Sequence, residues 1–350
     1  MIRGLFRFLL NVLRMFVRAL DLVVRGVFYA LLIFGLGVLV SFFFHPEPEV
    51  QAGSALVLRP VGTIVEQAEL EPPLALLRAG GAPAGQLRLA DLVDAVRKAR
   101  DDARIAALVI ETDELVGGGF SKLAELRAAI ADFKASGKPV LARGERFTQS
   151  QYYLASVADE LHLSPDGFVL LRGLARYGSY FKDALDKLGV KVHVFRVGEY
   201  KSFSEPFTRS DMSDEDREAT RDLLDGLWRF MRDDIAASRK LTPAAVDAHV
   251  NDIRGALAAA GGDAAKAALA AGLVDRFSTR DEWRARLVEA VGTDHEGKDV
   301  RAIEVDAYLA LAADDQVSVK NYLDKIRISG ELLLSLVNDT LTISKIENQK

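Results

Sequence analysis

The stretch IAALVIETDELVGGGFSKLAELRAAIADFKASGKPVLA, residues 105–142, decides the fold class of this chain. It begins with the strand-like run Ile105–Glu111, continues with the helical pattern Ser121–Ala135 and ends with a second strand-like run, Pro139–Ala142. A strand, a helix and a strand in this order form a parallel pair with the helix packed across it. The stretch therefore predicts an α/β fold.

The same alternation extends to both sides of this stretch. Leu89–Ala99 is a helical pattern, and further strand-like runs lie at Ala55–Arg59, Glu160–Leu163 and Val192–Val197. We therefore expect an α/β domain over residues 53–313, with a parallel sheet surrounded by helices.

Helix ends are marked by capping residues. Ser213 with Asp216, and Thr279 with Glu282, have the spacing of capping boxes at helix N-termini. Gly272 follows the alanine-rich helical segment 263–271, where a left-handed residue is favoured. The helix after Ser213 is predicted to be long and well packed, because its apolar residues keep helical spacing: Leu223, Leu224, Leu227, Trp228, Phe230, Met231 and Ile235.

A long apolar run lies close to the N-terminus. Val27–Phe44 is apolar apart from small residues and one serine, long enough as a helix to cross most of a hydrocarbon core. Segment 1–26 is basic, whereas the linker 45–52 carries prolines and glutamates, so the N-terminus is expected to be cytoplasmic. We predict an uncleaved signal anchor at 27–44 in a bacterial inner membrane, with the main domain periplasmic; cleavage as a signal peptide stays an alternative.

The composition excludes several classes of function. The chain has 350 residues, a net charge of -5 and no long basic run outside its N-terminal segment, which argues against a nucleic-acid partner. It has no cysteine, so thiolate nucleophiles and cysteine-ligated zinc are excluded. No two of the five histidines have the close spacing of a helical metal site, and we expect neither a metal nor an organic cofactor.

Two features of the sequence could take part in chemistry. Gly117, Gly118 and Gly119 follow a strand-like run and could turn backbone N–H groups toward an oxyanion or a phosphate, although such clusters are usually plain turns. Lys201 follows the run Val192–Val197, at the end of a parallel strand where α/β sheets present functional groups. A catalytic lysine needs a desolvated ammonium, whereas most lysines are surface charges. The aromatic neighbours that could desolvate it are Tyr200, Phe203 and Phe207.

Two further stretches are specific to one family. They read QYYLASVADELHLSPDG (Gln151–Gly167) and YFKDALDKLGVKVHVFRVGEYKSFSEPFTRSDMSDEDREA (Tyr180–Ala219). Together they resemble the long, two-repeat form of signal peptide peptidase A, and the resemblance extends from the apolar N-terminal run to about Ala313. It implies a fold of the ClpP/crotonase-like superfamily, in which the first repeat supplies a lysine base and the second a serine nucleophile.

This resemblance also assigns roles to residues. Lys201, within YKSFSEP, matches the lysine of the serine–lysine dyad, and the triple glycine resembles a degenerate form of the oxyanion loop. The position of the nucleophile, shortly before a tyrosine pair, is occupied by Gln149. Ser150 is adjacent, but it stands where the family has a glycine, so its use would need a displaced backbone. The resemblance thus covers the N-terminal repeat, without a serine-bearing second repeat.

The last segment, 314–350, follows another pattern. Gln316–Lys350 reads as one amphipathic helix and resembles the second dimerisation helix of a sensor histidine kinase. The phosphoacceptor helix and nucleotide-binding glycine boxes are absent from the sequence, which argues against a kinase. The apolar seam is expected to pair with a second copy of the chain or to remain an unpaired tail.

We therefore expect a membrane-anchored serine endopeptidase that degrades signal peptides or other apolar peptides and assembles as a homo-oligomer. The alternative is a non-catalytic subunit that binds peptides or assembles with a serine-bearing chain.

Overall fold

The computed structural model describes residues 29–37, 50–68 and 85–312. The chain divides into two compact units, Met1–Glu49 and Val50–Lys350. In the first unit, residues 29–37 are helical. The rest of the predicted anchor, the basic segment and the predicted tail helix lie outside the described residues. Among the residues that are described, no helix has both the length and the apolar character needed to cross a bilayer.

The second unit is built on a six-stranded sheet in the order β8-β7-β6-β4-β1-β9, with every neighbouring pair parallel. This confirms the predicted parallel α/β fold, and β4 and β7 have the predicted bounds. The strands are β1 (Ser54–Leu58), β4 (Ile105–Glu111), β6 (Val140–Gly144), β7 (Glu160–Leu163), β8 (Arg276–Phe277) and β9 (Ala302–Glu304).

Helices cover both faces of this sheet, which explains why its strands are almost continuously apolar. Leu56 of β1 belongs to the core shared with α3 (Leu89–Asp101) and α4 (Phe120–Ala135). Its neighbour Val57 belongs to a smaller core on the other face, formed with α12 (Arg280–Val291). Successive residues of one strand therefore serve two cores, as the pleat of a strand requires.

A second, three-stranded parallel sheet lies at the carboxyl ends of the central strands. Its order is β3-β2-β5, from β3 (Gln86–Arg88), β2 (Gly62–Val65) and β5 (Leu115–Gly117). β5 follows β4 after only three residues, and the predicted glycine turn leads from its last residue, Gly117, to the start of α4.

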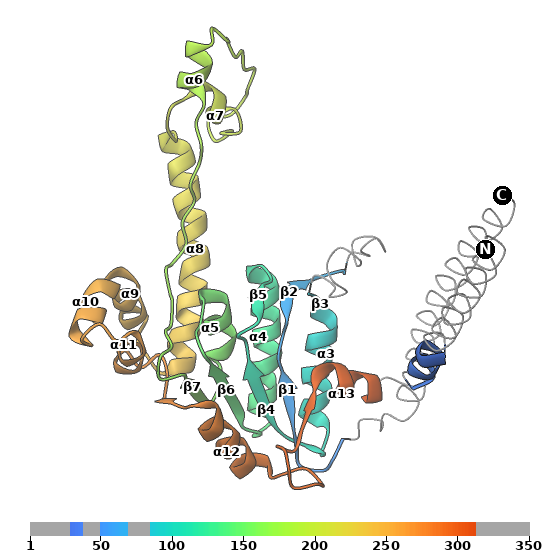
Figure 1. The fold of residues 1–350 in the computed structure, drawn as a ribbon. Coiled ribbons are helices and arrows are strands. Elements are labelled where there is room, and N and C mark those ends of the chain that lie inside the picture. Colours follow the sequence, from blue (N-terminus) through green and yellow to red (C-terminus); the bar gives the residue numbers. More distant parts are fainter. Residues whose placement is uncertain (1–28, 38–49, 69–84, 313–350) are drawn as a thin grey trace, which may run out of the picture. The chain divides into compact units, whose positions relative to one another are not determined.

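Three short helices and α13 (Val305–Ala312), the last helix of the described residues, complete the domain around the sheet. α9 (Pro243–Asn251), α10 (Ile253–Ala259) and α11 (Ala264–Ala270) lie together beside the long helix α8 (Asp214–Arg239) (Figure 1). α13 packs on α3 and β1. The predicted N-caps Ser213 and Thr279 accept backbone hydrogen bonds at the starts of α8 and α12, and Gly272 is left-handed at φ +70°.

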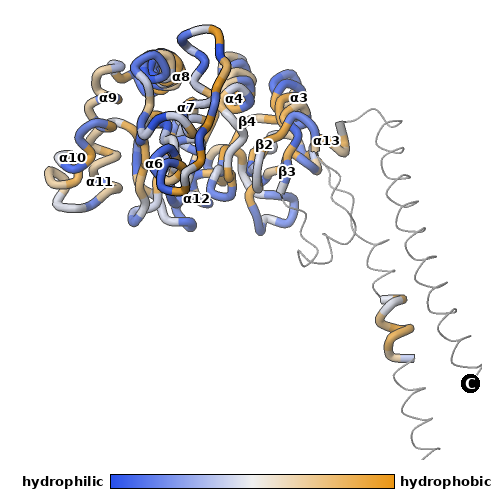
Figure 2. Tube along the Cα trace, turned by 90° about the horizontal axis from the view of Figure 1, so that it is seen from above, coloured by the Kyte–Doolittle hydropathy of each residue, from blue (hydrophilic) through white to orange (hydrophobic). Residues whose placement is uncertain are grey.

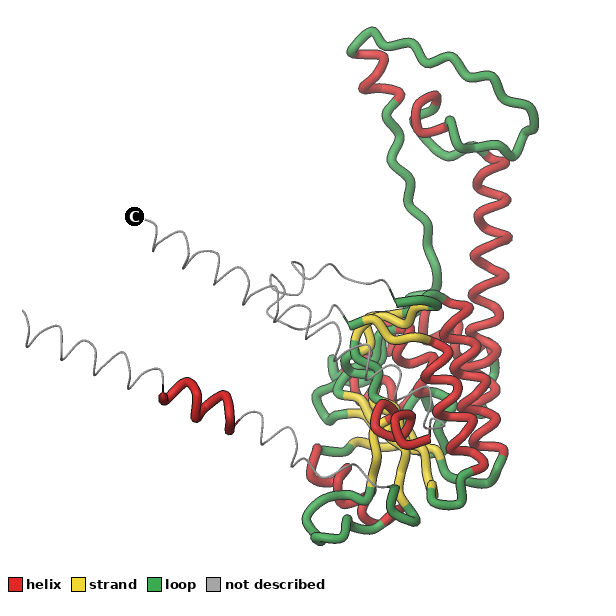
Figure 3. The backbone as a smooth tube through the Cα atoms, turned by 90° about the vertical axis from the view of Figure 1, so that its right-hand side faces the viewer, coloured by secondary structure: helices red, strands yellow, loops and turns green. Residues whose placement is uncertain are grey.

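Residues 174–230 form an arm, which is defined here as the segment leaving the sheet domain together with the N-terminal part of α8. Figures 1 and 3 show α8 rising from the domain, with α6 (Lys182–Lys187) and α7 (Glu205–Thr208) at its far end. The far end, residues 178–212, is called the tip. The root is the C-terminal part of α8, residues 231–239, with the side chains of α4 and α5 (Gln149–Ala155) on which it packs.

Two expectations for this region are wrong. Val192–Val197 is not a strand: within the described chain it pairs with no other strand, and it forms an exposed extended segment of the tip. The tip, which runs past α6 in Figure 2, contains orange apolar stretches, and the apolar residues of this segment have no sheet to join. The helix after Ser213 is long, but it is packed only near the root, because Met231 is 4% exposed whereas Leu223 is 61% exposed.

Candidate functional site

The glycine turn lies at the carboxyl edge of the sheets, at the N-terminus of α4. A Cβ on Gly118 would stand 2.8 Å from the Cβ of Ile64, so the close approach of the turn to β2 requires glycine. Gly119, with φ +76°, is the N-cap of α4 and offers no side chain to cap it. The first N–H groups of a helix have no partners within that helix. This turn is therefore suited to hold a negatively charged oxygen.

The start of α5 is tied to the same edge. Gln151 forms a capping box with Thr148, and its Nε2 donates to the carbonyl oxygens of Leu115 at 3.0 Å and Asp113 at 3.2 Å. Gln149 is occupied structurally: its Oε1 accepts from the N–H of Arg172 at 2.9 Å, and its Nε2 donates to the carbonyl of Gly173 at 3.1 Å. The residue at the nucleophile position thus anchors the beginning of the arm.

Ser150, the neighbouring serine, is half-buried on α5. In the described part of the chain no hydrogen bond joins its hydroxyl to a lysine or a histidine. The structure therefore brings the glycine turn and the start of α5 together, but it places no general base beside Ser150.

The tyrosine pair that follows is buried and fixes the root of the arm. Tyr152 donates from its hydroxyl to the carbonyl of Leu273 at 2.7 Å, and Tyr153 donates to Oδ2 of Asp234 at 2.5 Å. Burial raises the pKa of both tyrosines, which keeps them protonated donors. Since Asp234 belongs to α8, the second bond joins α5 directly to the root.

Arg127 of α4 completes this connection. Only 5% exposed, it stacks on the Tyr153 ring at 4.8 Å and donates from Nη2 to the carbonyl of Asp234 at 2.8 Å and to the Ser238 hydroxyl at 2.6 Å. Burial lowers its pKa, against the attraction of the surrounding oxygens. Sequence reasoning did not identify Arg127, because an arginine within a helical pattern is usually solvated.

Lys201 lies at the tip, in a turn before α7, and its side chain is exposed. The turn is held by Arg196, which donates to the Lys201 carbonyl at 3.0 Å, and by Ser202, whose hydroxyl donates to Asp216 of α8 at 2.7 Å. The expected aromatic wall does not form within one chain, since Tyr200 and Phe203 are 60% and 93% exposed. Figure 1 shows the tip far from α4 and α5, so Lys201 and the glycine turn do not meet in this chain.

The tip has a buried polar contact that the sequence did not reveal. Glu205 is only 2% exposed and accepts from Ser213 twice, from the N–H at 3.0 Å and from the hydroxyl at 2.6 Å. This pair closes the turn between α7 and α8 and fixes the segment that carries Lys201. The only trace of it in the sequence was the capping role of Ser213.

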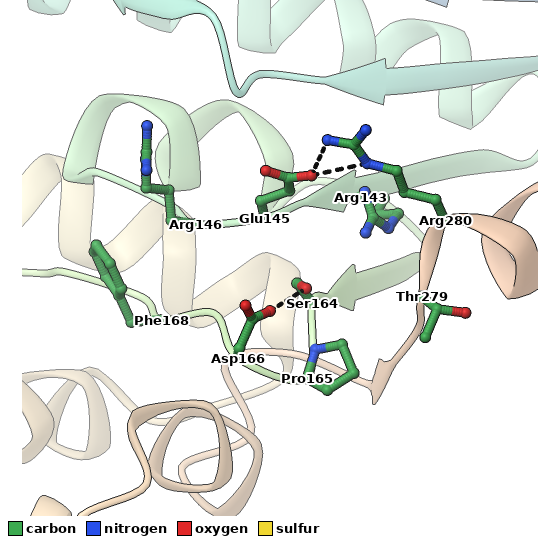
Figure 4. Close-up of a pocket in the computed structure, with 9 residues that line it drawn as sticks. All are labelled: Arg143, Glu145, Arg146, Ser164, Pro165, Asp166, Phe168, Thr279 and Arg280. Carbon is green, nitrogen blue, oxygen red and sulfur yellow. Dashed lines mark hydrogen bonds and ion pairs between the residues drawn. The ribbon is translucent and has the colours of Figure 1, made fainter.

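A cavity of about 580 Å³ opens where β6 and β7 end and α12 begins (Figure 4). It is called the arginine pocket below. Sequence reasoning did not find it, because its walls come from three separate segments. Its lining residues are Arg143, Glu145, Arg146, Ser164, Pro165, Asp166, Phe168, Thr279 and Arg280.

Comparison with known proteins places this domain in a class. Residues 132–294 match the family model described as Peptidase family S49, a segment that holds Lys201, the tyrosine pair and the arginine pocket. The chain therefore carries a peptidase family S49 domain, which together with the relatives below confirms the resemblance to signal peptide peptidase A seen in the sequence.

Within that family the chain is similar to Protease 4. It is 36% identical to "Protease 4" of Salmonella typhi over 312 residues, which are 88% of this chain and 50% of that protein. It is 29% identical to "Serine protease SPPA, chloroplastic" of Arabidopsis thaliana over 194 residues, which are 55% of this chain and 27% of that protein. The chain thus spans half or less of the length of these relatives.

Solved structures are less similar. The match to an enoyl-CoA hydratase/isomerase family protein from Silicibacter pomeroyi covers 70% of this chain and 80% of that protein. The sequence identity is 17% and the TM-score is 0.38. A likeness at this level carries no argument about function, and the parallel α/β fold rests on the strand order itself.

Proposed function

We propose that this chain supplies the lysine of a serine–lysine dyad in a membrane-anchored endopeptidase of the signal peptide peptidase A type, which degrades signal peptides. The observation that carries the proposal is the presentation of Lys201 at the end of a projecting arm, outward and beside exposed aromatic rings. A lysine that acted within its own domain would point toward the sheet and its helices. Lys201 is instead exposed at the tip, where a partner could reach it.

The tip exposes far more apolar surface than a solvated loop needs. Exposed apolar groups of this extent usually mark an interface. A second copy of the chain is the partner proposed here, in line with the expected homo-oligomer. The exposed apolar residues are Phe181, Leu188, Val190, Val192, Val194, Phe195, Val197, Tyr200, Phe203 and Phe207.

Such contact would also give Lys201 its chemistry. A lysine becomes a general base when its ammonium loses water, because desolvation disfavours the charged form and lowers the pKa. In the proposed assembly, partner surface covers Tyr200 and Phe203 and withdraws the Lys201 ammonium from solvent. Because Gln149 occupies the family's nucleophile position in every copy, the nucleophile would be another serine of the partner copy, which the labelling experiment below identifies.

The proposed reaction is acyl transfer. The neutral Nζ of Lys201 takes the proton of the serine hydroxyl while Oγ attacks the peptide carbonyl. Backbone N–H groups stabilise the oxyanion, and Nζ then returns the proton to the leaving amine as the C–N bond breaks. Water hydrolyses the resulting acyl-enzyme by the same steps. The apolar segment 27–44 would anchor the chain in the membrane, where apolar signal peptides are found.

A second candidate function is a non-catalytic subunit that binds peptides or assembles with a serine-bearing chain. The observation in its favour is Gln149, which occupies the nucleophile position and has both amide atoms engaged in hydrogen bonds. In this case the arm would still contact a partner, but Lys201 would take no part in turnover.

A serine-reactive fluorophosphonate probe separates the two functions. The detergent-solubilised chain is treated with the probe, labelled serines are identified by mass spectrometry, and hydrolysis of an apolar peptide reporter is measured in parallel. We expect labelling and hydrolysis that Lys201→Ala reduces at least a hundredfold, the lower range of general base catalysis.

Lys191→Ala, also an exposed lysine of the arm, is the matched control and should retain activity. Equal turnover in Lys201→Ala would remove Lys201 from the mechanism. Peptide binding with neither labelling nor turnover in the folded protein would support the non-catalytic subunit.

A further inference from the structure

The arginine pocket contains a buried cation that forms no direct ion pair with a described residue. Arg143 is 7% exposed, and the contacts of its guanidinium within the described chain are weak: Nε and Nη2 both donate to the carbonyl of Ser278 at 3.4 Å. No carboxylate of the described residues forms an ion pair with it. Since an unpaired buried charge is costly, a cation in this position needs an anionic partner.

The acidic groups around the pocket are already engaged elsewhere. Glu145 is paired with Arg280 at the start of α12. Asp166 accepts from the Ser164 hydroxyl at 2.6 Å, and Asp113, whose pKa is raised by burial, accepts from the N–H of Glu145 at 2.8 Å. Asp113 and Asp166 attract Arg143 at longer range, but no carboxylate of the described residues bonds its guanidinium directly.

The formal charge of the lining side chains is also positive. Arg143, Arg146 and Arg280 stand against Glu145 and Asp166, three positive groups against two negative ones. Arg146 is exposed, and in the described chain its side chain makes no hydrogen bond or ion pair. The same lining therefore holds a second guanidinium without a partner in the described chain.

We infer that the arginine pocket binds the free C-terminal carboxylate of a peptide, with Arg143 and Arg146 as the groups that recognise it. Guanidinium groups form strong, directional hydrogen bonds with carboxylates. Phe168, 37% exposed, supplies an apolar wall for the side chain of the last residue. The volume of about 580 Å³ exceeds what a simple ion needs and falls in the range of pockets that enclose small ligands.

The location of the pocket suits a peptide end. It lies at the carboxyl edge of the sheet, and the bond from Glu145 to Asp113 links its rim to the loop that leads to the glycine turn. This inference rests on the proposed function for the nature of the ligand. It adds that the pocket would distinguish a released peptide from the same segment within a longer chain. A signal peptide released by hydrolysis ends in a new carboxylate, whereas the same segment within an uncleaved precursor does not.

The test compares two fluorescent apolar heptapeptides that differ only in a free or an amidated C-terminus. Their binding to the full-length, detergent-solubilised chain is followed by fluorescence anisotropy, in the Lys201→Ala background so that no peptide is consumed. We expect the free carboxylate to bind at least about tenfold more tightly, the effect of one hydrogen bond between charged groups. Binding is read without turnover, so failure of the proposed peptidase activity would leave this result unaffected.

Variants assign the effect to the pocket. Arg143→Gln, which keeps a donor toward Ser278, and the exposed Arg146→Gln should each remove most of the preference for the free carboxylate. Arg254→Gln, at an exposed arginine of α10 outside the pocket, should retain it. If Arg143→Gln does not fold, the preference of Arg146→Gln for the free carboxylate tests the inference on its own.

Two outcomes would overturn the inference. One is equal binding of the two peptides by the unmodified pocket. The other is a preference for the free carboxylate that persists in folded Arg146→Gln and Arg143→Gln.

Discussion

The root and the tip of the arm contain the same kinds of side chain and use them in opposite ways. At the root, Arg127 and Tyr153 are buried against α8 and every polar group of the pair has a partner. At the tip, Tyr200 and Phe203 stand in solvent around Lys201. The polar groups at the root therefore find their partners within one chain, whereas the aromatic rings at the tip stay exposed, as expected if the proposed partner covers them.

The largest effect is expected at the root. Arg127→Met removes a guanidinium that binds Asp234, Ser156 and Ser238, and it leaves buried acceptors unpaired. We expect the free energy of unfolding to fall by about 3 kcal/mol, as for other broken buried polar networks. Urea denaturation followed by circular dichroism measures this change.

Arg229→Met is the matched control for this prediction, because Arg229 is an exposed arginine of α8, the helix that Arg127 binds. Its effect should stay within about 0.5 kcal/mol. Equal losses in the two variants would show that the root is no more tightly built than the rest of α8, and the contrast with the tip would disappear.

A smaller effect concerns pH and the helix beside the root. His249 of α9 is 6% exposed, and neither ring nitrogen has a hydrogen-bond partner in the described structure. Burial lowers its pKa, so the folded state keeps the ring neutral while the unfolded chain takes up a proton below about pH 6.5. Stability should therefore fall as the pH drops from 6.5 toward 5.

His249→Met should make this pH dependence flatter and, at pH 7, leave stability unchanged or raise it by about 1 kcal/mol, since it removes unpaired buried nitrogens. Thermal unfolding at a series of pH values measures both quantities. His193→Met, at an exposed histidine of the tip, is the control. An unchanged slope in His249→Met would show that other groups cause the acid sensitivity.

The smallest effect on stability is expected at the tip. Phe203 is 93% exposed, so Phe203→Ser should change the free energy of unfolding by less than about 0.5 kcal/mol. Self-association, measured by sedimentation velocity in detergent, should nevertheless weaken, because the proposed interface loses an aromatic ring. Lys191→Ser is the polar control. A stability loss as large as that of Arg127→Met would mean that the tip packs on its own chain.

Much of the fold could be predicted from the sequence because its signals are local. Ile105–Glu111 is recognised by a continuous apolar run, and the start of α12 by the contact between Thr279 and Glu282 three residues apart. Val192–Val197 failed because a strand needs a neighbouring strand, and no local pattern states whether one exists. The helical spacing of Leu223 and Phe230 predicted a helix correctly, but it did not show what covers them.

The candidate site was less accessible to sequence reasoning. Lys201 was singled out by a family resemblance, yet its position at the end of an arm depends on Arg127 and Tyr153, which are distant in sequence. Arg143 lies within a strand and gave no signal at all. Its importance comes from Ser278 and from a cavity whose walls only the folded chain brings together.

The length of α8 makes the arm a lever. The part of α8 beyond the root, residues 214–230, corresponds to about 26 Å, so a rotation of 5° at the pivot would displace the far end by roughly 2 Å. Misplacement of a reacting group by about 1 Å can already cost a hundredfold in rate. The stiffness of this pivot, which is the root of the arm, would then determine how accurately Lys201 is positioned, rather than any contact near the lysine. Substitutions at the pivot would reach a reaction centre that they never touch.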